Sequence, residues 1–108
     1  MRHREQLLPI PTADVAFLHS QHEQVWLTTT GGKRHAVDYT LEQVEKLLDP
    51  ARFFRLNRQV LATAEAIQRI DLHFNGKLKL TLRPELAEEV LVSREKAPAF
   101  RGWLEQGG

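Results

Sequence analysis

Apolar, aromatic and β-branched residues gather in short stretches along this chain, and polar turn residues separate them, which is typical of β-strands joined by turns. Strands are predicted at residues 15–19, 25–30, 34–39, 60–62 and 90–92, and in both arms of a hairpin over 67–83. Gln21-His22-Glu23 favours a turn between the first two strands, and Gly31-Gly32 favours a two-residue turn after the second. The pattern therefore predicts a chain made largely of short strands.

The Asn75-Gly76 pair predicts the turn of the later hairpin, and two loop lengths are compatible with it. A two-residue loop pairs Phe74 with Lys77 and divides the apolar residues between the two faces. A three-residue loop with Gly76 in the left-handed conformation pairs His73 with Lys77 instead. One face then carries four apolar residues: Ile70, Leu72, Leu78 and Leu80. Because an antiparallel sheet favours one buried face and one solvated face, we predict the three-residue loop.

The remaining apolar residues follow helical spacing and predict two short helices. The first begins after Thr40, which forms a capping-box pattern with Gln43, and it ends before Pro50. Its apolar stripe consists of Leu41, Val44, Leu47 and Leu48. The second begins at Ser93, a preferred capping residue, and runs to about Leu104. Its apolar stripe consists of Phe100, Trp103 and Leu104.

Length and composition restrict the class of protein. At 108 residues the chain fits one domain, and no repeat or linker marks a second one. The absence of cysteine excludes a disulfide framework and a thiolate metal site. No apolar run approaches the roughly 20 residues of a membrane span, and residues 1–5 lack the apolar core of a signal peptide. We therefore expect a cytoplasmic protein.

The distribution of charge is more informative than its total. The net charge is only +1, which is a weak signature for a protein that binds nucleic acid. The basic residues form three local groups: Lys33, Arg34 and His35; Arg52, Arg55 and Arg58; and Arg94, Lys96 and Arg101. Acidic residues concentrate elsewhere, in residues 42–49 and 85–89. A nearly neutral chain can therefore still present one basic face.

The segment from Phe53 to Gln59 mixes core-forming residues with residues suited to binding. We expect its aromatic residues and leucine to fix it to the globular body, so that Arg55, Asn57 and Arg58 stand out from the surface. Arginine grips phosphates with two parallel hydrogen bonds, and arginine and asparagine read guanine and adenine edges. The alternative is a surface turn with ordinary solvated charges.

A second candidate site lies at Ser93-Arg94, where a strand ends and a helix begins. Free backbone amides at the start of a helix attract phosphate. Arg94 can project past the backbone toward a base edge, and Lys96 lies nearby. Here too the alternative is an exposed arginine that pairs with Glu95 or with water.

Enzymatic chemistry is not expected from this sequence. His19 and His22 lie three residues apart, but no third metal ligand is near them, and catalytic zinc normally needs three protein ligands. Ser93 is fully explained as a helix cap, and Gly31-Gly32 lacks the pattern of a phosphate-binding loop. We therefore expect no metal, no cofactor and no catalytic residue.

Four motifs in one order carry a resemblance to a known family. Residues 53–60, Phe-Phe-Arg-Leu-Asn-Arg-Gln-Val, closely resemble the central motif of LytTR-type DNA-binding domains. Residues 29–33 and the acidic helix over 41–48 precede this motif as in that family. Asn75-Gly76-Lys77-Leu78, and residues 92–100 with Trp103-Leu104, follow it. The resemblance covers the chain from about Leu8 to Leu104.

The resemblance implies a mostly β fold of small antiparallel sheets, with short flanking helices near 41–48 and 94–104. Members of the family are bacterial transcription regulators, often output domains of two-component systems. They insert loops into successive major grooves of double-stranded DNA. The receiver domain that usually accompanies this domain is absent from the 108 residues, and Arg2, Arg4, Glu5 and Gln6 interrupt the expected N-terminal strand.

The family pattern also implies which residues contact DNA. Bases would be read by Arg34 in the first loop, by Asn57 and Arg58 in the second, and by Arg94 in the third. Phosphates would be contacted by Lys33, Arg52, Arg55 and Lys96. The expected partner is double-stranded DNA with repeated half-sites, on which two copies can assemble.

Two other classes of function compete with this interpretation. A protein-interaction module is favoured by the low net charge, with Phe100 and Trp103 as contact residues. Binding of RNA would need exposed aromatic residues to stack on bases, whereas Trp26, Phe53 and Phe54 are expected in the core. Salt distinguishes DNA binding from a protein-interaction module. Binding to several phosphates weakens steeply as salt rises, whereas an apolar interface barely responds.

Overall fold

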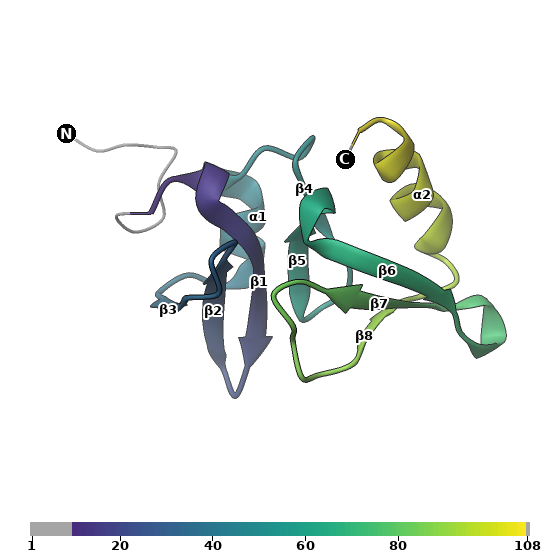
Figure 1. Ribbon diagram of the computed structural model, residues 1–108, viewed down its shortest axis with the longest axis horizontal. Helices are drawn as coiled ribbons and strands as arrows, with labels where there is room; N and C mark the ends of the chain where they lie inside the picture. Colours follow the sequence, from purple (N-terminus) through teal and green to yellow (C-terminus); the bar gives the residue numbers. More distant parts are fainter. Residues whose placement is uncertain (1–9, 108) are drawn as a thin grey trace.

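The computed structural model describes residues 10–107 and has a mostly β architecture (Figure 1). The first antiparallel sheet has the order β3-β2-β1-β5-β4, and the second has the order β6-β7-β8. The first sheet contains β1 (Val15–Gln21), β2 (Gln24–Thr29), β3 (Arg34–Val37), β4 (Phe53–Arg55) and β5 (Val60–Thr63). The second contains β6 (Ile67–Leu72), β7 (Leu78–Leu82) and β8 (Val90–Val92). The helices are α1 (Leu41–Leu47) and α2 (Ala97–Glu105), and short 3₁₀ turns lie at Thr12–Asp14, Ala64–Ala66 and Phe74–Gly76.

Both predicted hairpins of the first sheet are present, but the loop of the second is one residue longer than predicted. Gln21 pairs with Gln24, so His22 and Glu23 form a two-residue turn with φ angles of 53° and 63°. Positive φ at both central residues is the geometry that matches the twist of the two strands. The two-residue turn predicted at Gly31-Gly32 is wrong, because the amide of Thr29 donates to the carbonyl of Lys33 at 2.8 Å and three residues, 30–32, form the loop. Gly32 ends this loop with a φ of 95°, a conformation that favours glycine. Local turn chemistry therefore sets both hairpins of the first sheet.

The three-residue loop predicted for the later hairpin is also confirmed. The amide of His73 donates to the carbonyl of Lys77 at 2.9 Å, and Leu72 pairs with Leu78. Asn75 and Gly76 both have positive φ, at 65° and 76°. The four apolar residues share one face as expected, and Leu78 and Leu80 are buried. Ile70 and Leu72 are not buried, because β6 is the edge strand of its sheet.

The helices agree with the sequence except at two points. Thr40 and Gln43 form the capping box in both directions, and Leu41, Val44 and Leu48 are buried. Leu47 is exposed, because it lies about 100° around the helix from its neighbour Leu48.

The second helix begins later than predicted. Ser93 caps a turn, since its hydroxyl accepts from the amide of Lys96 at 3.1 Å, but α2 itself starts at Ala97. Pro98 occupies the first turn of α2, where its missing amide costs little. Residues 94–96 therefore form a turn before the helix rather than its first positions.

The core divides into two clusters on opposite faces of the first sheet. One cluster lies between this sheet and α1 and includes Leu18, Leu27, Val44 and Phe53. The other lies between the first sheet, the second sheet and α2, and includes Phe17, Leu80 and Phe100. Figure 1 shows α1 behind the first sheet and α2 beside the second. Consecutive residues of β4 point to opposite faces, so Phe53 joins the first cluster and Phe54 packs against the second.

Some expectations concern the ends of the chain. Pro11 is extended, and its amide-free ring precedes the 3₁₀ turn at Thr12–Asp14. Leu8, Pro9, the interrupted N-terminal strand at residues 2–6 and Gly108 lie outside the described residues. Neither described helix is long and apolar enough to cross a membrane.

Candidate nucleic-acid interface

All the candidate contact residues except Arg52, which precedes β4, lie in or beside three turns. These are residues 30–33 between β2 and β3, residues 56–59 between β4 and β5, and residues 93–96 between β8 and α2. Four of the predicted side chains are exposed: Lys33, Arg34, Arg58 and Arg94. The other four are half-buried: Arg52, Arg55, Asn57 and Lys96. The two groups have different environments.

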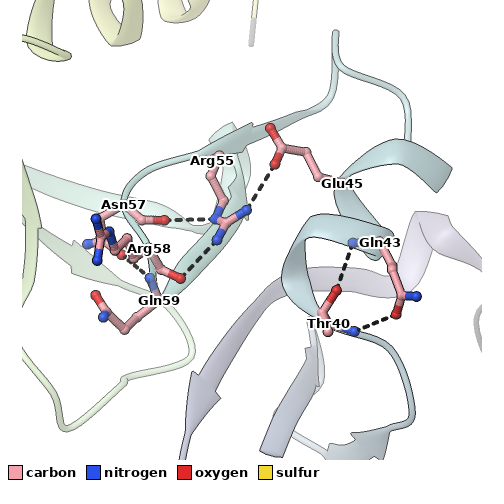
Figure 2. Close-up of polar contacts among 7 residues, drawn as sticks. All are labelled: Thr40, Gln43, Glu45, Arg55, Asn57, Arg58 and Gln59. Carbon is pink, nitrogen blue, oxygen red and sulfur yellow. Dashed lines mark hydrogen bonds and ion pairs between the residues drawn. The ribbon is translucent and has the colours of Figure 1, made fainter. Parts of the chain in front are cut away.

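Arg55 holds the second turn closed. Its Nε donates to the carbonyl of Asn57 at 2.8 Å, and its Nη2 donates to the carbonyl of Arg58 at 2.9 Å. Its Nη1 forms an ion pair with Glu45 of α1 at 2.9 Å (Figure 2). All three guanidinium nitrogens therefore have partners within the protein. The prediction that Arg55 stands out from the surface is wrong, because the side chain folds back onto its own turn.

Asn57 also points inward rather than outward. Its Oδ1 accepts from the amide of Gln59 at 2.7 Å, which fixes the local turn. Its Nδ2 donates to the carbonyl of Leu91 in β8 at 2.8 Å. A base contact by this side chain would require one of these hydrogen bonds to break. The side chain therefore connects the second turn to the second sheet.

Arg58 is the exposed cation of the second turn. Its carbonyl is held by Arg55, while Figure 2 shows its side chain directed away from Arg55. Arg58, Ser93 and Lys96 line one solvent-open hollow of about 390 Å³. The Nζ of Lys96 lies over the ring of Phe54, 5.4 Å from its centroid. The structure thus brings the second and third turns together around positive charge.

Arg94 is supported by the tip of the β6–β7 hairpin. Its side chain is 72% exposed, and its nearest charged neighbour is Glu95 at 3.9 Å. A Cβ atom added at Gly76 would lie 2.8 Å from both Cγ and Cδ of Arg94. Only glycine therefore lets the aliphatic part of Arg94 rest against this backbone. The Asn75-Gly76 motif identifies the turn, but its contact with Arg94 was not predicted.

Arg34, beside the first turn, contacts Trp26 and His19 rather than the residues of the other two turns. The guanidinium of Arg34 lies over the ring of Trp26, 5.2 Å from its centroid, and its Nη2 is 3.4 Å from Nε2 of His19. Because arginine only donates, Nε2 accepts and the proton of neutral His19 sits on Nδ1. Lys33 is exposed, and its amide donates to the hydroxyl of Thr29 at 3.0 Å. Trp26 is half-buried beneath Arg34 rather than enclosed in the core as predicted.

The charge state of His19 depends on its burial. Only 2% of the residue is exposed, and Nδ1 has no hydrogen-bond partner in the part of the chain that the structure describes. Burial lowers the pKa of His19 below its ordinary value of 6.5, and the charge of Arg34 acts in the same direction. Gln21 and Glu88 oppose this shift. The ring is therefore held neutral, in the form that accepts from Arg34.

Arg52 has a structural environment similar to that of Arg55. Its Nη1 donates to the carbonyl of Thr12 at 2.9 Å, and its guanidinium lies 5.0 Å from the centroid of the Phe53 ring. These contacts join the segment before β4 to the segment before β1. Across residues 10–107, no group of three or more His, Asp and Glu side chains is arranged to hold a metal ion.

Comparison with known proteins identifies related domains. The family model of the LytTR DNA-binding domain matches residues 5–105. Among solved structures, the chain resembles the LytTR DNA-binding domain of a Bacillus cereus protein described as a methyl-accepting/DNA response regulator. The sequence identity is 24% and the TM-score 0.75, over 90% of this chain and 86% of the other. No curated protein matches the chain significantly.

Proposed function

The chain belongs to the LytTR family of DNA-binding domains, which act in transcription regulation, and we propose that it reads a specific double-stranded sequence with exposed side chains from three turns. The family resemblance and the mostly β fold expected from the sequence are confirmed. In the proposed mechanism the turns enter successive major grooves. The longest dimension of the molecule, 47 Å, exceeds the roughly 34 Å of one helical turn of DNA.

The observation that supports this proposal is that some candidate side chains are exposed, whereas others already form hydrogen bonds within the protein. Arg34, Arg58 and Arg94 are exposed, and we assign them to base edges, with guanine as the preferred partner of arginine. Lys33 is exposed beside Arg34 and is assigned to phosphate. Arg52, Arg55 and Asn57 already bond within the protein. We therefore assign these three to positioning the turns rather than to DNA itself.

The hollow between the second and third turns supports a phosphate contact there. Lys96 contributes an ammonium group and Ser93 a hydroxyl at its edge, next to Arg58. A phosphate oxygen can accept from both groups, which would fix the register of the duplex. Arg58 and Arg94 would then meet base edges on either side of this anchor.

The two residues proposed as contacts of a protein-interaction module, Phe100 and Trp103, pack within the chain instead. Phe100 is completely buried, and Trp103 stacks on Phe54 with the ring centroids 5.1 Å apart. The indole nitrogen of Trp103 also donates to the carbonyl of Ala51. Both residues hold α2 to the rest of the fold. We also propose that the chain is a single domain, because the first sheet contributes to both core clusters. We propose the bacterial cytoplasm as its place of action, because a DNA-binding domain must reach the chromosome.

The test combines in vitro selection with substitution of the reading residues. Randomised duplexes are selected on the chain, and binding of the selected duplex and of random DNA is measured by fluorescence anisotropy. Arg58→Ala and Arg94→Ala should each weaken binding to the selected duplex by about 1–3 kcal/mol while changing binding to random DNA much less. Arg101→Ala, an exposed arginine of α2, is the matched control and should bind as the parent chain does.

Salt provides a second arm of the same test. Affinity should fall steeply as salt rises from about 50 to about 200 mM, because several phosphates are neutralised. If selection returns no preferred sequence, or if both variants bind the selected duplex as tightly as the parent chain, the proposed reading residues are wrong.

A further inference from the structure

Strand β6 is an open edge of the second sheet. Within residues 10–107, its hydrogen-bonded neighbour is β7 alone, and its substantial contacts are also with β7. Among the described residues, no backbone hydrogen bond from another segment reaches the outer side of residues 68–72. Figure 1 shows the β6–β7 hairpin extending away from the first sheet, with its tip at the far right of the view. An unpaired edge of this kind can accept a further strand.

The backbone groups of this edge point outward at known positions. His73 bonds to Lys77, and hydrogen-bonded pairs alternate along an antiparallel ladder. Asp71 and Arg69 therefore direct their amides toward β7, while Ile70 and Leu72 direct theirs to solvent. The side chains of the latter two are 44% and 82% exposed, and that of Phe74 beyond them is 69% exposed. The edge thus offers both backbone groups and apolar surface.

We infer that β6 pairs antiparallel with β6 of a second copy of this chain, about a two-fold axis at Ile70. Ile70 then lies opposite Ile70 of the second copy, and the two residues exchange both backbone hydrogen bonds. Arg69 of each copy lies opposite Asp71 of the other. Gln68 lies opposite Leu72. A two-fold interface of this type uses the same patch on both subunits, as symmetric dimers require.

The order of charges along β6 selects this register. Arg69 and Asp71 lie on the same face and already form an exposed ion pair at 3.1 Å within one chain. Centring the axis on Ile70 extends them into an alternating ring of two positive and two negative side chains. Centring it on Arg69 or on Asp71 would place like charges directly opposite one another, which destabilises a strand pair. The central residue is also one whose amide and carbonyl face outward.

The second copy fits this edge better than an unrelated strand does, because the pattern is complementary to itself. The interface is small, so the dimer is weak and forms at high protein concentration. This inference concerns the free protein and does not depend on the proposed base contacts. Its failure would leave DNA binding untouched, and its success would not establish DNA binding.

Charge exchange tests the pairing and its register together. Sedimentation equilibrium of the complete chain, from about 10 µM to about 1 mM, should show the mass rising from 12.5 kDa toward twice that value. Arg69→Asp alone and Asp71→Arg alone should each weaken self-association by about tenfold or more, because like charges then face each other at two symmetric positions. An equimolar mixture of the two variants restores opposite charges at both positions and should dimerise like the parent chain.

Neither charge substitution should disturb the fold of the chain. Both substitutions lie on the exposed face of an edge strand, so thermal unfolding should be within a few degrees of the parent chain. A parent chain that stays at 12.5 kDa throughout would overturn the inference and leave the edge to another partner. Unchanged dimerisation of the single variants, or a mixture that stays monomeric, would overturn it as well.

Cross-linking provides an independent measurement of the register. Because the chain has no cysteine, Ile70→Cys introduces one thiol per copy. Across the axis its Cα atoms would be about 5.5 Å apart, which permits a disulfide. Gln68→Cys is the matched control, since its Cα atoms would lie more than about 13 Å apart in the same dimer. Mild oxidation should link Ile70→Cys and not Gln68→Cys, and the reverse result would contradict the register.

Discussion

Replacing Arg55 by alanine distinguishes a brace of the second turn from a contact with DNA. The change removes two hydrogen bonds to the carbonyls of Asn57 and Arg58 and the ion pair with Glu45. Each hydrogen bond contributes about 0.5–1.5 kcal/mol net. The ion pair adds less, because the side chains of Arg55 and Glu45 are 20% and 46% exposed and water screens them. We expect the free energy of unfolding to fall by about 2 kcal/mol.

Two assays measure the consequence. Thermal unfolding should show a loss of about 8 °C in Tm, since about 1 kcal/mol corresponds to about 4 °C in a domain of this size. Affinity for the selected duplex should also fall, because the turn that carries Arg58 loses its support. The dependence of log affinity on log salt should keep its slope, because no phosphate contact has been removed.

A matched variant makes the result decisive. Arg55→Lys keeps the charge but cannot bond to both carbonyls and Glu45 at once, so its Tm should fall nearly as far as that of Arg55→Ala. If instead Arg55→Ala keeps its Tm and lowers the salt slope by about 0.9, the guanidinium contacts a phosphate and the brace is refuted.

Two further predictions concern the hairpin tip that contacts Arg94 and the buried His19 of β1. Gly76→Ala should weaken binding to the selected duplex by about tenfold, because the added Cβ would lie 2.8 Å from the Arg94 side chain and φ is 76° at this position. Asn75→Ala, at the exposed tip, is the control in the same anisotropy assay. Equal effects of the two substitutions would argue against a specific role for the Gly76–Arg94 contact. For His19, whose pKa is lowered, the unfolded chain binds a proton near pH 6.5 that the folded chain does not, so stability should fall as pH drops below that value. Urea unfolding at about pH 7 and about pH 5 should show a smaller pH-dependent loss in His19→Gln, and an unchanged loss would contradict this assignment.

The local features of the fold could be predicted from the sequence because their causes are local. Gly32 in one hairpin, and Asn75 and Gly76 in the other, supply the positive φ angles that their turns require. Thr40 and Gln43 satisfy each other's backbone amides within one turn of helix. Each of these signals involves residues at most three positions apart.

The inward orientation of the candidate site could not be predicted in the same way. Arg55 bonds to Glu45, which is ten residues away in the sequence. Asn57 bonds to the carbonyl of Leu91, at a separation of 34 residues. Such partners become neighbours only when α1 and β8 are packed against the second turn. The residue types favoured DNA binding, in agreement with the family to which the chain belongs. Only the tertiary structure separates the exposed Arg58 from Arg55, whose guanidinium already bonds within the protein.

The exposure of β6 has a similar cause. Alternation correctly placed Ile70 and Leu72 on the face shared with Leu78 and Leu80. Burial depends in addition on which strand lies at the edge, and sheet order is a property of the whole chain. The same reasoning explains Trp26, whose residue type suggested the core but which lies half-buried beneath Arg34.

Repeating the in vitro selection with Arg34→Ala, Arg58→Ala and Arg94→Ala tests the central claim most directly. If side chains from three turns read DNA together, each variant should lose base preference at its own position and keep it elsewhere. The outermost of these positions should lie about one helical turn, roughly 10 base pairs, apart. Variants that all return the parent sequence unchanged, or that lose preference uniformly along the site, would contradict the account.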